Sequence, residues 1–440
     1  MDAYQKGFIK MSNDFYLSVG IDVGADFSFM SIALPNQTFV GKPFRITHAN
    51  PASLEKAVLT IKEAEESNSL KAHIFLESTG IYHYPLFCYL RDKGFPVSIV
   101  NPIITKSSTN INIRKVHNDK FDSKKLALIA LKPDLKVSVI PSDLVLDLRN
   151  LTREYYNLMD CRSAYVNKLQ GELRVAFPQY LGIFSKLTVE TSLALLEKYA
   201  IPTAFLTAKK SAVIKVISST ARFGTAYAER QYQAILAAAE AAANFGHALP
   251  SNGKLIKLYV SFIKKYGEEI DGILAAMHEL VDAHPDEPFV NQIHLLETFK
   301  GAGFLSAATV MCEIGDFSVF KSPKQLFAYF GLDPAVKQSG KFNGTDVKMS
   351  KRGSPLARRV IHTMALISIG RTRKGVANNS VLRDYYLSKC QSKPKMVALG
   401  AVMHKVCNIV FAILRDEKPF TVISPSQHKL NYLQSHRLAA

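Results

Sequence analysis

One apolar stripe in the middle of the chain does most to limit what this sequence can fold into. Large apolar residues recur there at spacings of mostly three and four, which is typical of one long helix with a coiled-coil seam. The positions are Leu144, Leu148, Leu151, Tyr155, Leu158, Arg162, Tyr165, Leu169, Leu173 and Ala176. Only Arg162 breaks the seam, and Pro178 follows its end. A helix of this length needs a partner along its apolar face.

A second long helical pattern supplies that partner. It begins after about residue 226, and its apolar positions are Leu255, Tyr259, Phe262, Tyr266, Ile273 and Leu280. The residues between the two patterns lack strand signals, so we predict an antiparallel coiled-coil arm with a small helical patch between its helices. An ordinary helical bundle is the alternative. Arms of this kind commonly dimerise, so a homodimer is expected.

The residues before the arm alternate short apolar runs with helical patterns. We predict strands at 16–24, 27–35, 39–47, 72–77 and 96–102, and helices at 51–66, 81–92 and 119–131. Three strands, then helix, strand, helix, strand and helix is the order of the ribonuclease-H-like fold.

A third unit is expected from about Leu295. The stretch F-K-G-A-G-F-L-S-A-A-T-V sets Gly301 and Gly303 before a helix, which is the form of a helix-hairpin-helix whose backbone N–H groups can hold a phosphate. A helix ending at Gly331 and a basic helix from about Pro355 follow. The predicted fold class is therefore α/β plus α. The predicted boundaries are an N-terminal extension at 1–15, the α/β domain at 16–143, the arm at 144–290, a mainly helical domain at 291–418 and a polar tail at 419–440.

The charge of the chain favours a polyanionic partner. Lys and Arg number 55 against 37 Asp and Glu, a net charge of +18. Between Lys337 and Lys374 there are ten Lys or Arg and one acid, Asp346. Nucleic acid is the partner expected first, and a membrane surface is the weaker alternative. No apolar run of 18 residues and no signal peptide is evident, and the five scattered cysteines are typical of a reducing cytoplasm.

Four carboxylates lie at positions that a ribonuclease-H-like fold brings together. Asp22 lies on the first strand, Glu77 ends the fourth, and Asp119 and Asp122 begin the last helix of this domain. Converging carboxylates repel unless they bind cations, and hard oxygen ligands select Mg²⁺ or Mn²⁺. Two such ions roughly 3.5–4 Å apart could orient a nucleic-acid phosphodiester. The alternative is structural, because an Asp after a strand is often a turn residue and Asn118 or Asp119 could be an N-cap.

The same residues carry a resemblance to a known family. G-I-D-V-G, L-E-S-T-G-I-Y-H and N-D-K-F-D-S-K-K-L-A resemble the N-terminal domain of the DEDD-type insertion-sequence transposases, which include the pilin-gene invertases. G-A-G-F-L-S-A-A-T-V and M-S-K-R-G-S-P-L-A-R-R resemble their C-terminal domain. The resemblance runs from about residue 17 to 415. One departure is Ser123, because the family has D-x-x-D-A where this chain has D-K-F-D-S.

The resemblance implies more than the residues alone do. It implies a RuvC-like domain with a magnesium-binding acidic site at Asp22, Glu77, Asp119 and Asp122, and a second domain whose serine attacks DNA and forms a covalent phosphoserine. The S-G dipeptide assigns that serine to Ser339. The resemblance also implies donor and target DNA, dimers of dimers in which the acidic site of one subunit completes the serine site of another, a bacterial cytoplasm at the nucleoid, and in some members a guide (bridge) RNA.

The residues near Ser339 suit phosphate binding. Gly340 would let a backbone approach closely, and a set of basic residues could hold the scissile phosphate. They are Lys337, Lys341, Lys348, Lys351, Arg352, Arg358 and Arg359. A serine in a basic loop is otherwise more often a phosphate contact than a nucleophile. Ser350 is the nearest rival, and it is interpreted as a cap or a phosphate contact.

Four functions fit these observations to different degrees. A DNA transposase or site-specific recombinase uses both the acidic site and Ser339. A RuvC-like junction nuclease would use only the acidic site, with water as the nucleophile. In a sugar-kinase or actin-like ATPase, D-V-G-A-D-F-S would be the phosphate loop after the first strand. That fold also needs a second phosphate loop downstream, where this sequence has the coiled-coil arm instead. A non-catalytic nucleic-acid-binding protein leaves the four acids unexplained.

Overall fold

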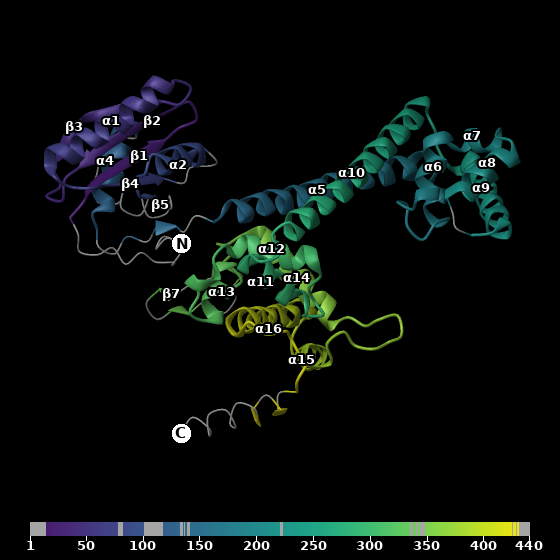
Figure 1. The fold of residues 1–440 in the computed structure, drawn as a ribbon. Coiled ribbons are helices and arrows are strands. Elements are labelled where there is room, and N and C mark those ends of the chain that lie inside the picture. Colours follow the sequence, from purple (N-terminus) through teal and green to yellow (C-terminus); the bar gives the residue numbers. More distant parts are fainter. Residues whose placement is uncertain are drawn as a thin grey trace. The chain divides into compact units, whose positions relative to one another are not determined.

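The computed structural model describes two compact units. One comprises Met1–Ser142 with Asp316–Lys321, and the other comprises Asp143–Gly315 with Ser322–Ala440. The residues described are 15–77, 82–100, 118–132, 135, 137–138, 141–220, 223–334, 338–339, 342–343, 348–424, 426–427 and 429–430. The first unit is a mixed α/β sheet with helices, and the rest of the chain is largely helical (Figure 1). The predicted class of α/β plus α is confirmed at this level.

The first unit is built on a six-stranded sheet in the order β3-β2-β1-β4-β5-β6. Strands β1, β2 and β3 are antiparallel, β4 and β5 run parallel to β1, and β6 is antiparallel to β5. The five predicted strands are all present, and only β6 was not predicted, because two residues carry no periodicity. The strands are β1 Leu17–Val23, β2 Phe27–Ala33, β3 Phe39–Thr47, β4 Ala72–Glu77, β5 Val97–Val100 and β6 Val137–Ser138.

Helices cover both faces of this sheet. Alternate residues of a strand face opposite sides. On β4, Ile74 and Leu76 pack in one core with α1 (Pro51–Asn68) and α2 (His83–Asp92), whereas Phe75 packs with Leu126 of α4 (Asp119–Ala130) on the other side. The three predicted helices are therefore confirmed, with α4 alone on its face among the described residues.

Two long helices pack side by side in the second unit (Figure 1). Helix α5 spans Asp143–Ala176 and α10 spans Pro250–Asp282. Tyr165 stacks among Tyr259, Phe262 and Tyr266 of α10. Arg162, the break in the predicted seam, donates from Nε to the carbonyl oxygen of Ile263 at 3.2 Å. The arginine therefore serves the pairing of the two helices.

Among the described residues, five helical elements lie between α5 and α10 in the chain. They are η3 Pro178–Gly182, α6 Glu190–Lys198, α7 Pro202–Leu206, α8 Lys210–Thr220 and α9 Thr225–Phe245. Phe177 and Tyr180 are fully buried in this helical cluster, and the ring of Phe205 contacts both in tilted arrangements. The predicted helical patch between the two long helices is present.

The C-terminal helices of the second unit surround α16. The elements are α11 Pro288–Glu297, α12 Phe304–Ile314, α13 Pro323–Tyr329, β7 Gln338–Ser339, β8 Phe342–Asn343, α14 Pro355–Ile369, α15 Ser380–Cys390 and α16 Lys395–Asp416, and the short turn η4 Phe317–Val319 belongs to the first unit. Helix α16 is long and apolar enough to cross a membrane by length and composition, although His404 and Lys405 interrupt its apolar sequence. Val402, Val406 and Val410 are nonetheless buried against the neighbouring helices, so α16 is the core helix here.

The predicted helix-hairpin-helix corresponds to α11, a short turn and α12. A Cβ atom at Gly301 would lie 2.8 Å from the carbonyl oxygen of Met364 and 2.3 Å from Ser368 Oγ, both on α14. Gly303 is the N-cap of α12 and has open space around it. Gly301 is therefore required by the close approach of α14, while Gly303 is not sterically required.

Candidate functional site

Two of the predicted acidic residues end neighbouring strands. Ile21 of β1 pairs in parallel register with Leu76 of β4, so Asp22 and Glu77 are the next residues on the two strands. Both side chains are partly exposed at the ends of these strands. Parallel register brings them to the same edge of the sheet.

Helix α4 is seated unusually close to β1. A Cβ atom at Gly20 would lie 2.3 Å from the backbone nitrogen of Ala127 and 2.5 Å from the carbonyl oxygen of Ser123. Ser18 Oγ donates to the carbonyl oxygen of Ala127 at 2.7 Å. Only a glycine at position 20 permits this approach, and the approach fixes the start of α4 beside the end of β1.

The family departure at Ser123 has a structural explanation. Ser123 is fully buried, and its hydroxyl lies 2.8 Å from Ser31 Oγ of β2. It also donates to the carbonyl oxygen of Lys120 at 3.1 Å. Each buried hydroxyl thus satisfies the other, which an alanine at position 123 would prevent.

The cap of α4 is Asn118. Its side chain accepts from the backbone nitrogen of Lys120 at 3.1 Å. Asp119 and Asp122 therefore do not cap the helix, although both lie in its first turn, where acids are favoured by the helix dipole. The capping alternative applies to Asn118 and leaves the two aspartates available for another role.

The four carboxylates interact electrostatically. Burial, followed by the charges of Asp122, Glu77 and Asp119, raises the pKa of Asp22 from 3.8 to about 7. The structure therefore brings Asp122, Glu77 and Asp119 within electrostatic reach of Asp22.

Donor chemistry favours a hard divalent cation at this cluster. All four groups are carboxylates, which suit Mg²⁺ or Mn²⁺. No three of the described His, Cys, Asp or Glu side chains, however, stand in an arrangement that could hold an ion as they are placed. Residues 78–81, directly after Glu77, lie outside the described part of the chain. The donor types fit a magnesium ion, and a closed set of ligands would require side-chain movement.

Ser339 lies in a short hairpin. It belongs to β7, where it pairs antiparallel with Phe342 of β8. Lys337 and Lys341, predicted to bind nucleic acid, lie outside the described residues. Lys348, Lys351 and Arg352 are described and exposed.

The loop before α14 is held tightly by its own contacts. Ser350 Oγ donates to Asp333 Oδ1 at 2.5 Å, and Ser354 caps α14 by accepting from Ala357 N at 3.2 Å. A Cβ atom at Gly353 would lie 2.0 Å from the carbonyl oxygen of Tyr329. Ser350 is thereby explained as a loop contact, and the loop presents Lys351 and Arg352 to solvent.

Two of the arginines predicted to bind nucleic acid have protein partners. Arg358 donates from Nη1 to the carbonyl oxygens of Phe330 at 3.1 Å and Gly353 at 2.5 Å. Arg359 pairs with Asp160 at 2.9 Å, and its guanidinium lies 4.9 Å from the ring centre of Tyr156. Their contact with nucleic acid stays a prediction, while their structural contacts are clear.

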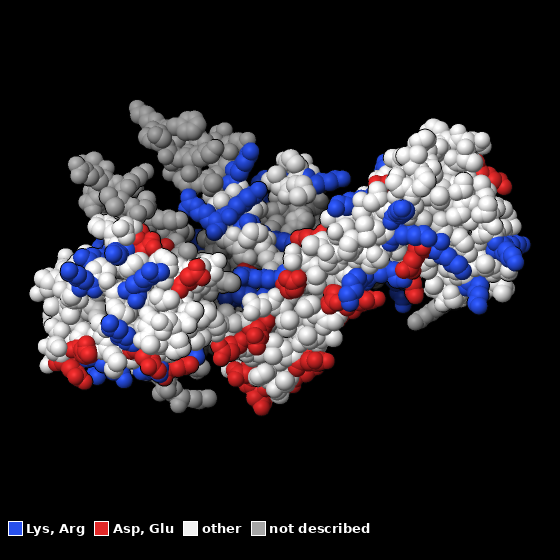
Figure 2. Space-filling model, turned by 90° about the horizontal axis from the view of Figure 1, so that it is seen from above, with Lys and Arg blue, Asp and Glu red and all other residues white. Residues whose placement is uncertain are grey.

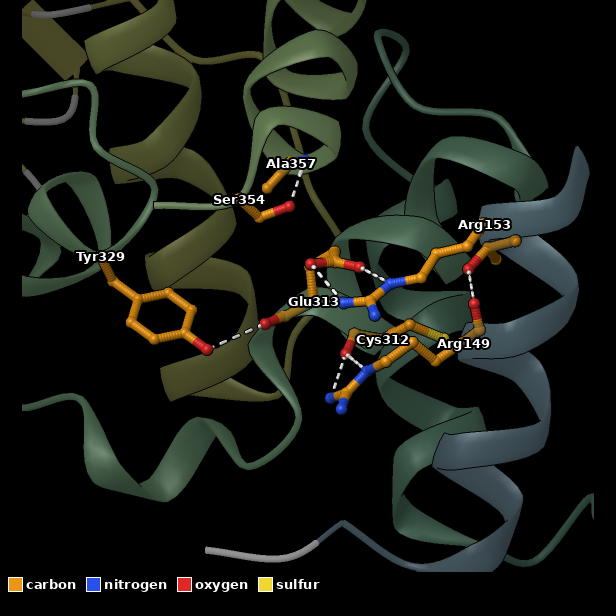
Figure 3. Close-up of polar contacts among 8 residues, drawn as sticks. Arg149, Arg153, Cys312, Glu313, Tyr329, Ser354 and Ala357 are labelled. Atoms are coloured by element: carbon orange, nitrogen blue, oxygen red, sulfur yellow. Dashed lines mark hydrogen bonds and ion pairs between the residues drawn. The ribbon is translucent and has the colours of Figure 1, made fainter. Parts of the chain in front are cut away.

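A buried polar cluster was not predicted from the sequence (Figure 3). Glu313 is almost fully buried near the end of α12, and Arg153 of α5 pairs with both its oxygens, at 3.0 and 3.3 Å. Arg149 donates to the carbonyl oxygen of Cys312 at 2.8 Å, and Tyr329 Oη donates to that of Glu313 at 3.1 Å. The sequence signal that could have indicated this cluster is the single acid, Glu313, within the otherwise apolar stretch V-M-C-E-I-G. The cluster fixes the start of α5 against the C-terminal helices.

Figure 2 shows one face of the molecule, on which the Lys and Arg side chains of the described residues lie in several separate groups, with acidic side chains close to some of them. Candidate contacts with nucleic acid therefore depend on local arrangements.

Comparison with known proteins gives the same family from both ends of the chain. Residues 19–178 match a family model described as transposase, of the DEDD IS110 type. Residues 293–386 match a model described as transposase of the IS116/IS110/IS902 family. These matches contain the acidic cluster and the Ser339 segment, respectively.

Individual relatives agree with the family matches. The 44.8 kDa protein of insertion element IS116 from Streptomyces clavuligerus is 24% identical over 70% of this chain and 74% of its own length. The pilin gene-inverting protein of Moraxella bovis is 27% identical over 36% of this chain and 47% of its own length. The 43.6 kDa protein of insertion element IS110 from Streptomyces coelicolor is 26% identical over 38% of this chain and 39% of its own length. The chain belongs to the IS110-type transposase family, whose members are enzymes of DNA transposition and recombination.

Proposed function

We propose that this transposase cuts and rejoins DNA by using the acidic cluster together with Ser339 as nucleophile. The observation that carries the proposal is the acidic cluster itself: burial, together with the charges of Asp122, Glu77 and Asp119, raises the pKa of Asp22 to about 7 in a chain of net charge +18. Such a cluster opposes folding and binding of a polyanion unless a cation joins it, so its presence calls for a function. We further propose that the first unit is a RuvC-like, ribonuclease-H-like domain and that α5 and α10 form a coiled-coil arm.

The acidic residues would hold the metal. Asp22, Glu77, Asp119 and Asp122 are the proposed ligands of Mg²⁺, with Mn²⁺ as a substitute. A bound ion of this kind supplies positive charge that orients a phosphodiester and stabilises charge on its oxygens. Asn118 and Gly20 position the ligands, the first by capping α4 and the second by admitting it against β1.

Ser339 would exchange one phosphoester for another. Its Oγ forms a bond to the scissile phosphorus while the bond from phosphorus to the leaving deoxyribose oxygen breaks, and the serine proton passes through solvent to that oxygen. Attack by a DNA hydroxyl on the phosphoserine reverses the exchange and frees the serine. The number of phosphoester bonds is unchanged, so rejoining needs no nucleotide triphosphate. Lys348, Lys351 and Arg352 are exposed nearby in the sequence and would hold the phosphate.

The family resemblance supports two proposed partners beyond DNA. One is a guide RNA that pairs with target and donor DNA, and the other is a second or further copy of this chain. A DNA substrate implies work at the nucleoid. Treatment of the purified complex with ribonuclease before the reaction tests the RNA: loss of activity, restored by adding back the co-purified RNA, is the expected result.

A covalent-trapping assay tests the central proposal. The protein, Mg²⁺, its co-purifying RNA and labelled DNA spanning the element junction are denatured and separated on a gel. A protein–DNA adduct is expected, and Ser339→Ala and Asp122→Ala should both abolish it. Ser388→Ala is the matched control, because Ser388 is an exposed residue of α15, outside both the acidic cluster and the Ser339 segment, and this variant should retain the adduct. Cleavage that survives Ser339→Ala without an adduct would instead establish the water-dependent RuvC-like nuclease.

A further inference from the structure

A basic hairpin joins α14 to α15. Residues 370–378 turn back on themselves, with Arg371 bridged antiparallel to Ala377 and the backbone nitrogen of Thr372 donating to the carbonyl oxygen of Val376 at 2.8 Å. Gly375 closes the turn with φ of +80°. Figure 1 shows this yellow-green loop extending away from the helices on either side.

The base of the hairpin is fixed to the end of α14. Asn378 donates from its backbone to the carbonyl oxygen of Gly370 at 3.1 Å and from Nδ2 to that of Ile367 at 2.7 Å. Arg383 of α15 donates to the carbonyl oxygen of Ile369 at 2.6 Å. Asn379, only 3% exposed, caps α15 by accepting from Leu382 N at 3.0 Å. These hydrogen bonds therefore fix the orientation of the hairpin relative to α14 and α15.

The projecting part is cationic and exposed. Arg371, Arg373 and Lys374 are all exposed, and no acidic residue lies between positions 370 and 378. Within the described part of the chain, none of the three has an ion-pair partner. Val376 at the turn is 63% exposed. The three cations make no ion pair that would give them a structural role within the residues that the structure describes.

We propose that the hairpin at residues 370–378 is a DNA-binding element that contacts the backbone phosphates of a duplex. A narrow two-stranded ribbon fits the wide major groove of B-form DNA, whereas the major groove of A-form RNA is deep and narrow. Arg and Lys on such a ribbon reach phosphates on both sides of the groove. The proposal rests on the proposed function, since it takes a DNA substrate as given, and it adds a contact outside both the acidic cluster and the Ser339 segment.

Salt-dependent binding of a blunt duplex tests the hairpin. The triple variant Arg371→Gln, Arg373→Gln, Lys374→Gln is compared with the triple control Lys209→Gln, Lys215→Gln, Lys257→Gln, which removes the same charge from exposed positions elsewhere in the second unit. Each lost phosphate contact lowers the slope of log K against log salt by about 0.9. We expect the hairpin variant to lose between about 2 and 3 from this slope and on the order of tenfold or more in affinity for DNA. The control should keep the wild-type slope to within about 1.

Each outcome has one meaning. Equal slopes and affinities for the hairpin variant and the control would refute the hairpin contact. A loss confined to duplex RNA of the same sequence would refute the DNA assignment and make the hairpin an RNA contact. The covalent-trapping assay is scored separately: a wild type that binds DNA through the hairpin but forms no adduct refutes the recombinase mechanism alone. Circular dichroism of both triple variants should match the wild type, because all six side chains are exposed.

Discussion

At the scale of single residues, Asp22 is where function and stability conflict. Its pKa is raised from 3.8 to about 7 by burial and by three neighbouring carboxylates. A raised pKa means that the folded protein binds the proton more tightly than the unfolded chain does. The associated stability is therefore complete below about pH 4 and is lost as the pH rises through about 7. Without a cation, the folded protein is therefore least stable above about pH 7, where Asp22 is ionised and would bind a cation best.

Asp22→Asn should therefore stabilise the metal-free protein while abolishing strand cleavage. We expect the thermal midpoint to rise by a few degrees at pH 8 and by less at pH 5, since about 1 kcal/mol shifts a domain of this size by roughly 2–4 °C. Magnesium should raise the midpoint of the wild type more than that of the variant. Asp26→Asn is the control, because Asp26 is exposed and should change stability by less than about 0.5 kcal/mol. An Asp22→Asn protein that melts below the wild type at pH 8 would contradict the repulsion.

Ser31 and Ser123 form a second residue-scale test. Replacing Ser123 by alanine leaves the buried hydroxyl of Ser31 without its partner at 2.8 Å, so the single variant should lose about 1–3 kcal/mol of stability. The double variant Ser31→Ala/Ser123→Ala should be more stable than the sum of the two single changes predicts, with a coupling of at least about 0.5 kcal/mol. Denaturant unfolding of the four proteins measures this cycle. Additive single effects would show that the hydroxyl pair does not account for the departure from the family's alanine.

At the scale of elements, the seating of α4 on β1 depends on one glycine. Gly20→Ala would put a methyl group 2.3 Å from backbone atoms of α4, so the helix must move and take Asp119 and Asp122 with it. Overpacking of this kind should lower stability by about 1–3 kcal/mol. It should also weaken the stabilisation by Mg²⁺.

A second glycine provides the control for Gly20. Gly171→Ala in α5 meets no atom within 4 Å and should raise stability by roughly 0.5–1 kcal/mol, since alanine favours helices. Thermal melts with and without Mg²⁺ distinguish the two variants. A Gly20→Ala protein with wild-type stability and magnesium response would refute the seating argument.

Mutating either partner of the ion pair between Arg153 of α5 and Glu313 of α12 should change stability by different amounts. Glu313 is buried and Arg153 is largely exposed. Arg153→Met keeps the apolar stem but leaves a buried carboxylate unpaired, for which about 3–5 kcal/mol of destabilisation is expected. Adding Glu313→Gln to that variant removes the unpaired charge and should restore part of the loss, as measured by thermal melting. A double variant no more stable than Arg153→Met would contradict this account.

Elements with strong apolar periodicity were predictable from the sequence. Very short strands, and elements fixed by contacts between residues distant in sequence, were not. The five strands and the long helices follow from apolar runs and from spacings of three and four, which local sequence determines. Strand β6 and the β7–β8 hairpin have two residues per strand, too few for a pattern. The hairpin at 370–378 was visible only as part of a charge run, because the hydrogen bonds that fix its base to α14 join residues up to 14 apart in sequence.

At the scale of the whole molecule, the acidic cluster was predictable only as a set. No single acid predicts a site, but the order of the four along the strand pattern predicts a cluster, and the structure brings Asp122, Glu77 and Asp119 within electrostatic reach of Asp22. The buried pair of Glu313 and Arg153 joins positions 160 residues apart, and only the folded chain reveals it. Ser339 belongs to the second compact unit and the acids to the first. One question about the whole assembly is therefore whether a reaction draws both from a single chain.

Mixing two inactive variants decides between the arrangements. If the acids of one subunit serve the serine of another, Asp122→Ala and Ser339→Ala chains fail alone but form intact composite sites when co-assembled. In an equal mixture half of the dimers are mixed, and one of their two sites is intact, so about a quarter of the wild-type adduct is expected. The DNA must then be attached to the Asp122→Ala chain, the only one with a serine at position 339, and a size tag on one variant identifies that chain on the gel. A mixture as inactive as its components, under conditions where co-assembly is verified by co-purification through the tag, would mean that each chain supplies both its acids and its serine.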